Sequence, residues 1–113
     1  MNLTVEKRLF TTKQLDELIK GRKPFLLTCN STKGAFIRMI GGWDCKNVVQ
    51  DCYYLIKAEE LGYINLDNGA TIICDADGLE KMLEVNDFAT YLIGGVAKNY
   101  GMPIVGDVIV AFP

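Results

Sequence analysis

The chain has 113 residues, of which half are hydrophobic and 23% are charged, with a formal net charge of −2. This length suits one domain, which we expect to span residues 1–113, and the composition excludes an intrinsically disordered chain. Histidine is missing, so Ser-His-Asp and Cys-His catalytic systems are excluded. No apolar run is long enough to cross a bilayer, and residues 1–10 lack the pattern of a signal peptide. We therefore expect a cytoplasmic protein that makes no contact with a membrane.

The charges are distributed unevenly along the sequence. Residues 1–57 carry ten Lys and Arg against five Asp and Glu, a net charge of +5, whereas residues 58–113 carry two against nine, a net charge of −7. Such an asymmetry can mark an interaction surface. Alternatively, the two halves interleave in the fold and their fields cancel, and the sequence leaves both interpretations open.

The cysteines show neither a Cys-x-x-Cys pair nor the spacing of a zinc site. In a reducing compartment they are expected to serve as small apolar side chains. We therefore predict no metal and no cofactor. The four cysteines are Cys29, Cys45, Cys52 and Cys74.

Taken in chain order, residues 5–10 suit a first strand or an arm. The next segment predicts a helix, because Thr11 and Gln14 form a capping-box pattern and three apolar residues share one face. Gly21 is expected to end this helix.

Two β-prone stretches, residues 24–29 and 35–42, flank a turn-rich loop and predict a hairpin. A second helix follows, with Asp44 as its cap and Gly62 at its end. Its predicted buried face consists of Cys45, Val48, Val49, Cys52, Tyr53 and Ile56.

A second hairpin is predicted over residues 63–75, because Asp67-Asn68-Gly69 lies between two β-prone runs. Residues 86–101 predict a third helix, capped by Asn86 or Asp87 and open to a break at Gly94-Gly95, since glycine disfavours a helix interior.

Residues 103–112 predict a last strand with a bulge or kink at Gly106-Asp107. Together these elements predict an α+β fold, an antiparallel sheet of four to six strands with two or three helices packed on one face.

The stretch from Ile72 to Glu84 gathers four carboxylates around Gly78. An EF-hand alignment that places Gly78 at the sixth position puts Ile73 at the first, where an oxygen ligand is required, so calcium binding is not indicated. A glycosidase-like pair would need two carboxylates held across a cleft, which a turn does not provide. We therefore predict neither a catalytic nor a metal site, but a turn followed by a short helical segment, residues 79–84.

The same stretch carries a resemblance. Cys74-Asp75-x-x-Gly78, then Leu83-x-x-Asn86, then the late strand with its Val-Gly-Asp sequence at residues 105–107 are similar to a family of small phage and mobile-element proteins of unknown function. The resemblance covers residues 63–113. Glu84 stands where that family tends to have proline, and the family offers no active site to transfer.

This resemblance implies a phage or mobile-element protein that acts in a bacterial host cell. The lack of histidine and of a recognised nucleophile or metal motif argues against catalysis, so we expect a non-catalytic protein that binds a host protein. We expect a counter-defence inhibitor, such as an anti-CRISPR protein, whose carboxylates fill the nucleic-acid groove of a host enzyme. Direct binding of nucleic acid by the chain itself is disfavoured by its net negative charge, and a homodimer is compatible with the sequence. The residues assigned to the partner-binding surface are Glu59, Glu60, Asp75, Asp77, Glu80, Glu84 and Asp87.

Two alternatives remain open at this stage. One is a nucleotide or small-ligand binder that sequesters its ligand. The other is a small enzyme that uses carboxylates or a cysteine, with Cys29 and Cys74 as the candidates outside the helix stripe. For the nucleotide binder, the phosphate-binding candidates are Arg22, Lys23, Lys33 and Arg38, and the ring-stacking candidates are Trp43, Tyr53 and Tyr54.

Overall fold

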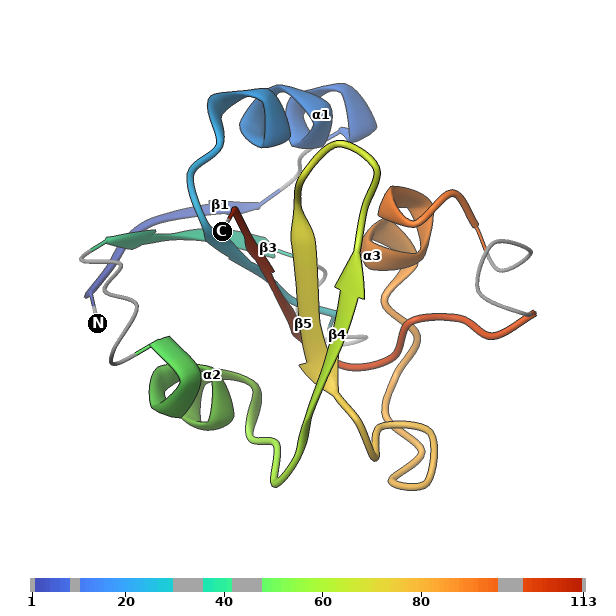
Figure 1. Cartoon of the computed structure of the whole chain (residues 1–113). Coiled ribbons are helices and arrows are strands. Elements are labelled where there is room, and N and C mark those ends of the chain that lie inside the picture. The colour runs from blue at the N-terminus through green and yellow to red at the C-terminus, as the bar shows by residue number, and fades with distance from the viewer. Residues whose placement is uncertain (1, 9–10, 30–35, 42–47, 96–100, 113) are drawn as a thin grey trace.

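The structure is a computed structural model that describes residues 2–8, 11–29, 36–41, 48–95 and 101–112. In the described residues, six strands form one fully antiparallel sheet of order β1-β3-β2-β6-β5-β4 (Figure 1). This confirms the predicted α+β class and the antiparallel sheet. The strands are β1 (Asn2–Arg8), β2 (Phe25–Leu27), β3 (Phe36–Gly41), β4 (Leu61–Asn65), β5 (Thr71–Asp75) and β6 (Val108–Ala111), and the helices are α1 (Thr12–Gly21), α2 (Val48–Ile56) and α3 (Asp87–Leu92).

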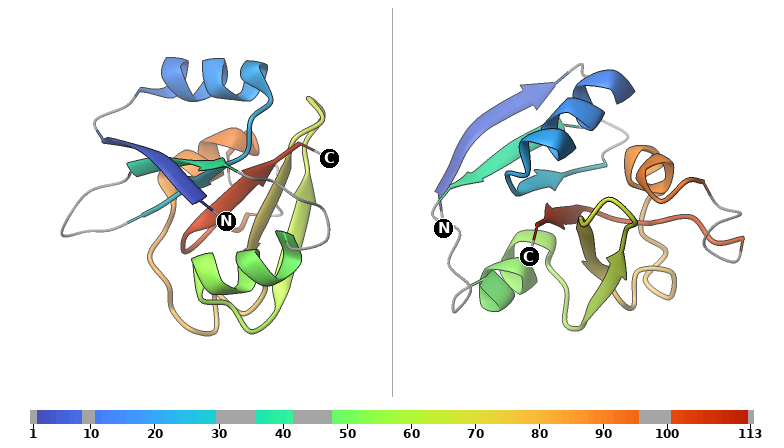
Figure 2. Two further views of the ribbon diagram at one scale, coloured as in Figure 1. Left: turned by 90° about the vertical axis from the view of Figure 1, so that its left-hand side faces the viewer. Right: turned by 45° about the horizontal axis from the view of Figure 1, so that its top comes forward.

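Helices cover both faces of this sheet. Residues of α1 and α3 share one apolar cluster with Phe25 and Leu27, whereas residues of α2 share a second cluster with Leu26. Because successive strand residues point to opposite faces, the two clusters lie on opposite sides of β2. Figure 2 shows α1 and α2 on opposite sides of the sheet. The prediction of two helices on one face therefore holds for α1 and α3, and α2 adds a second layer that the sequence did not indicate.

This second layer explains the composition of the central strands. Every residue of β2 and of β6 is buried, so neither strand shows the alternation of a half-exposed strand. On the α2 side, Cys52 is fully buried beside Ile56, which confirms its predicted role as a small apolar side chain. Tyr53, predicted on the same buried face, is instead 37% exposed. Cys45 and the predicted cap Asp44 lie outside the described residues.

The start of α1 is as predicted, whereas the predicted C-terminal ends of α1 and α2 differ from the observed ones. The capping box of α1 is confirmed, since Thr11 Oγ1 accepts from Gln14 N at 3.2 Å and Gln14 Oε1 accepts from Thr11 N at 2.9 Å. Gly21 is the last residue of α1, but the left-handed position expected for it is taken by Arg22, with a φ of 54°. Likewise Gly62 lies within β4, and Lys57, also with a φ of 54°, ends α2.

The second predicted hairpin and the third predicted helix are observed, with bounds that differ from the predicted ones. The turn between β4 and β5 contains Gly69 at a φ of 90°, as a tight hairpin turn requires. Helix α3 is capped by Asn86 and ends at Leu92, before two glycines with positive φ, so the predicted break at Gly94-Gly95 is observed. In the part of the chain that the structure describes, no helix is long and apolar enough to cross a membrane.

Candidate functional site

After β5 the chain forms turns and not the predicted helical segment. Leu83 N donates to Gly78 O and Met82 N donates to Leu79 O, both at 3.1 Å, which is the hydrogen-bond pair of a Schellman motif. Met82 takes the left-handed position of that motif with a φ of 56°, where glycine is usual. The single turn closes there, so the chain leaves it as an irregular segment. We call residues 75–86 the anchored loop.

The first anchor of this loop is Asp75, whose side chain is only 2% exposed. Its Oδ1 accepts from Asp77 N at 2.9 Å and its Oδ2 accepts from Lys81 Nζ at 2.8 Å. The hydrogen bond from Lys81 to this carboxylate raises the pKa of the Lys81 ammonium. Because Asp75 is enclosed by its own loop, its assignment to a partner-binding surface is wrong.

The second anchor is a close approach between the loop and the segment before β6. A Cβ added at Gly78 would lie 2.8 Å from Val105 Cγ2, and one added at Gly106 would lie 2.8 Å from Leu83 Cδ1. Gly106 N also donates to Glu84 O at 2.7 Å, and Gly106 has a φ of 79°. A side chain at Gly78 would require Val105 to shift and would approach Asp75 O to 3.2 Å, and one at Gly106 would require Leu83 to shift at a φ that disfavours side chains. Glycine is therefore favoured at both positions.

The third anchor is Asn86, which is 1% exposed. Its Nδ2 donates to Gly106 O at 2.9 Å and to Leu27 O at 3.2 Å. Its Oδ1 accepts from Ala89 N at 3.1 Å, which caps α3, and its own N donates to Ile104 O at 2.8 Å. One buried amide thus joins the end of the loop to β2, to α3 and to the segment before β6.

The anchors are the residues on which the resemblance to the phage family depends. They fix the course of the backbone through hydrogen bonds and close packing. The last of the similar residues, Asp107, accepts from Cys29 N at 3.0 Å and ties the same region to the end of β2. The residues shared with the resemblance and placed in these contacts are Asp75, Gly78, Leu83, Asn86, Gly106 and Asp107.

The anchored loop directs large apolar side chains into solvent. Met82 is 85% exposed, Leu79 is 47% exposed and Val85 is 43% exposed. The side chains of Glu80 and Glu84 are exposed between them. A fixed loop that combines exposed apolar groups with carboxylates has the character of a protein-binding surface. The sequence analysis missed Leu79, Met82 and Val85 because a helical segment would have buried part of this set.

Several of the predicted acidic residues come to the same end of the sheet. Glu60 O accepts from Ala76 N at 2.9 Å, which joins the start of β4 to the loop, and the Glu59 charge helps to raise the pKa of Lys81. Asp77 is half-buried, whereas Asp87 is exposed at the start of α3.

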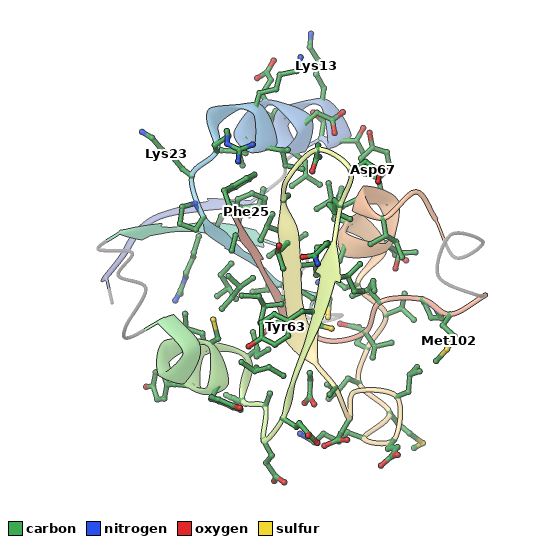
Figure 3. The ribbon with its side chains drawn as sticks, viewed as in Figure 1. Lys13, Lys23, Phe25, Tyr63, Asp67 and Met102 are labelled. Carbon is green, nitrogen blue, oxygen red and sulfur yellow. The ribbon has the colours of Figure 1, made fainter. Side chains whose placement is uncertain are left out.

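Two of the basic residues, Lys13 and Lys23, lie near α1 at the other end of the molecule (Figure 3). Acidic residues also occur at that end, since Asp16 and Glu17 lie on α1, and Lys81 pairs with Asp75 within the anchored loop. Both kinds of charge are therefore present at both ends.

The two candidate reactive cysteines have thiols that resist ionisation. Burial, with the nearby charges of Asp107 and Glu84, raises the pKa of Cys29 to about 11. Burial and the Asp75 charge also raise the pKa of Cys74. A thiol becomes a strong nucleophile only as the thiolate, so neither environment favours cysteine chemistry at neutral pH. Within the described ranges, no group of three or more Cys, Asp or Glu residues is arranged to hold a metal ion.

The residues predicted for a nucleotide divide into two places. The Arg22 guanidinium lies 5.4 Å from the centre of the Phe112 ring and donates to Asn68 O at 3.4 Å. Arg22 follows the last residue of α1 and so lies on the α1 side of the sheet. Arg38, Tyr53 and Tyr54 instead line one hollow beside α2. Lys33 and Trp43 lie outside the described residues.

Comparison of the chain with protein-family models, with curated proteins and with solved structures finds no match in any of the three. The resemblance to the phage and mobile-element family therefore stays a prediction, and the site is assigned from its own geometry.

Proposed function

We propose that this chain is a non-catalytic binding protein and that the anchored loop is its contact surface for a protein partner. The partner has a basic surface next to an apolar depression. The groove of a host nuclease that holds nucleic acid has this character, and the proposed role is that of a phage-type counter-defence inhibitor.

The observation that carries this proposal is the side chain of Met82. A left-handed conformation disfavours a residue other than glycine by about 1 kcal/mol, and an exposed side chain recovers little of this through burial. Met82 is nevertheless a large apolar residue that is 85% exposed. Burial does not account for a large apolar side chain at this position, whereas a flexible apolar side chain suits a protein contact. The anchors beneath it reduce the conformational entropy lost on binding.

The carboxylates around Met82 supply the charge complementarity. Glu80 and Glu84 lie within the loop, and Glu59 and Glu60 lie beside it at the start of β4. A group of carboxylates attracts a basic groove over a long range and increases the rate of association. The high pKa of Cys29 and the absence of histidine support a non-catalytic role.

The test is affinity capture from the native host, with the captured protein identified by mass spectrometry and then purified. Reversing three charges together, in Glu80→Lys, Glu84→Lys and Asp87→Lys, is expected to weaken binding at least tenfold and to flatten its dependence on salt. The matched control is Glu17→Lys, which reverses an exposed charge on α1. Unchanged affinity and salt dependence in the triple variant would show that the acidic end does not contact the partner.

A further inference from the structure

A hollow of about 640 Å³ lies on the α2 side of the sheet, and no residue of the anchored loop lines it. Small-molecule sites in proteins commonly enclose about 300–1,000 Å³ and combine apolar walls with a few polar groups. The polar and aromatic residues that line this hollow are Thr28, Arg38, Tyr53, Tyr54, Lys57 and Asp107.

The sheet register explains why three of these polar groups converge. Leu26 pairs with Arg38 of β3 on one side and with Ile109 of β6 on the other. Directly paired residues share a face, and both Leu26 and Ile109 pack in the α2 cluster, so Arg38 points to the α2 side. Thr28 and Asp107 lie two residues from Leu26 and Ile109, so strand alternation favours the same face for them.

Helix α2 closes the hollow with its last turn. Tyr53 and Tyr54 bring two rings, 37% and 83% exposed respectively, and Lys57 follows them in a left-handed conformation with a φ of 54°. Lys57 and Asp107 line the same hollow, so a cation and a carboxylate face the same space. Tyr53 was predicted to be buried, and its partial exposure at this hollow is the feature that the helical pattern did not reveal.

We propose that this hollow binds a small aromatic phosphate of the nucleoside monophosphate class. Arg38 and Lys57 offer two cations for a phosphate, and guanidinium groups bind phosphate oxygens in a fixed geometry. Tyr53 and Tyr54 offer faces on which a base stacks. The Thr28 hydroxyl donates or accepts, and the Asp107 carboxylate accepts from sugar hydroxyls or from an amino group of the base.

This site does not depend on the proposed protein contact, because none of its lining residues belongs to the anchored loop. The two proposals therefore fail separately. Met82→Gly, which alters the loop, is expected to leave nucleotide affinity unchanged.

The experiment is isothermal titration calorimetry, supported by thermal shift, with AMP, CMP, GMP and UMP. Ribose 5-phosphate and inorganic phosphate are the probes that lack the base. At least one nucleotide is expected to bind saturably at a 1:1 ratio and at least tenfold more tightly than ribose 5-phosphate. Equal binding of all probes would refute recognition of the ring, and an absence of saturable binding by any nucleotide would refute the site.

Two variants assign any binding to the hollow. Lys57→Gly removes the cation and suits the left-handed backbone, so it should keep the fold and weaken nucleotide binding at least tenfold. Tyr53→Leu removes a ring and should bring nucleotide affinity towards that of ribose 5-phosphate. Lys13→Gln, at an exposed cation on α1 outside the hollow, is the matched control and should bind as the natural chain does. Full affinity in Lys57→Gly and Tyr53→Leu would overturn the proposal.

Discussion

Asn86→Ala tests whether one buried amide holds the anchored loop to the sheet. The substitution removes the cap of α3, which typically contributes about 1 kcal/mol. It also removes two donors, to Leu27 O at 3.2 Å and to Gly106 O at 2.9 Å. Each of these buried hydrogen bonds contributes about 1 kcal/mol, and more where the carbonyl finds no new partner. We therefore expect a loss of about 3 kcal/mol in the free energy of unfolding.

The assay is equilibrium unfolding in urea, with the free energy taken from the midpoint and the slope. The matched control is Asn68→Ala, which removes an exposed asparagine whose Oδ1 accepts from Ala70 N at 3.0 Å. This control is expected to lose about 1 kcal/mol, since it removes one part-buried hydrogen bond and no helix cap. A loss in Asn86→Ala no larger than that of the control would refute the role of Asn86 as an anchor.

Three further predictions concern single contacts. Gly78→Ala places a Cβ 2.8 Å from Val105 Cγ2 and should lower the free energy of unfolding in urea by about 1–3 kcal/mol. Val105→Ala in the same chain should recover part of this loss, and strictly additive losses in the double variant would contradict the contact. Gly106→Ala combines an overlap with Leu83 and a φ of 79°, so Leu83→Ala should rescue it less completely than Val105→Ala rescues Gly78→Ala. Burial raises the pKa of the Asp107 carboxyl group above its ordinary 3.8, so the folded state binds a proton at this group more tightly than the unfolded state does. The contribution of Asp107 to the free energy of unfolding therefore falls as the pH rises from about 4 through the raised pKa. Relative to Asp107→Asn, which keeps an acceptor for Cys29 N, the natural chain should lose stability over that range in urea unfolding series, and a constant difference would contradict this.

Local signals in the sequence predicted local structure well. The capping box of Thr11 and Gln14 and the turn at Asn68-Gly69 each depend on residues within four positions of one another, and both are observed. The cap at Asn86 was also predicted. Its two bonds to Leu27 O and Gly106 O were not, because they join residues 59 and 20 positions apart.

Helix ends were predicted poorly because side chains other than glycine take the left-handed position. Arg22, Lys57 and Met82 have φ values of 54°, 54° and 56°. At Lys57 and Met82, hydrogen bonds from the following residues satisfy the last carbonyls, and at Lys57 the next residue, Ala58, is buried. A glycine-based rule does not detect ends that are stabilised in this way.

The predicted partner-binding residues differ in their exposure, which the sequence did not indicate. Glu80 and Glu84 are exposed, as a contact surface requires, whereas Asp75 is buried by its ion pair with Lys81. The exposed apolar residues of the loop, Leu79, Met82 and Val85, form a surface because the loop is irregular. The placement of α2 on the second face, which forms the hollow, depends on sheet order and is not encoded in any short pattern.

The most direct test of the account is a paired measurement on Met82→Gly. Glycine suits the left-handed φ of 56°, so the free energy of unfolding should stay equal or rise by about 1 kcal/mol. The affinity for the captured partner should fall at least tenfold, since the exposed apolar side chain is lost. A variant that is equally stable and binds the partner with full affinity would contradict the claim that the anchored loop presents Met82 for binding.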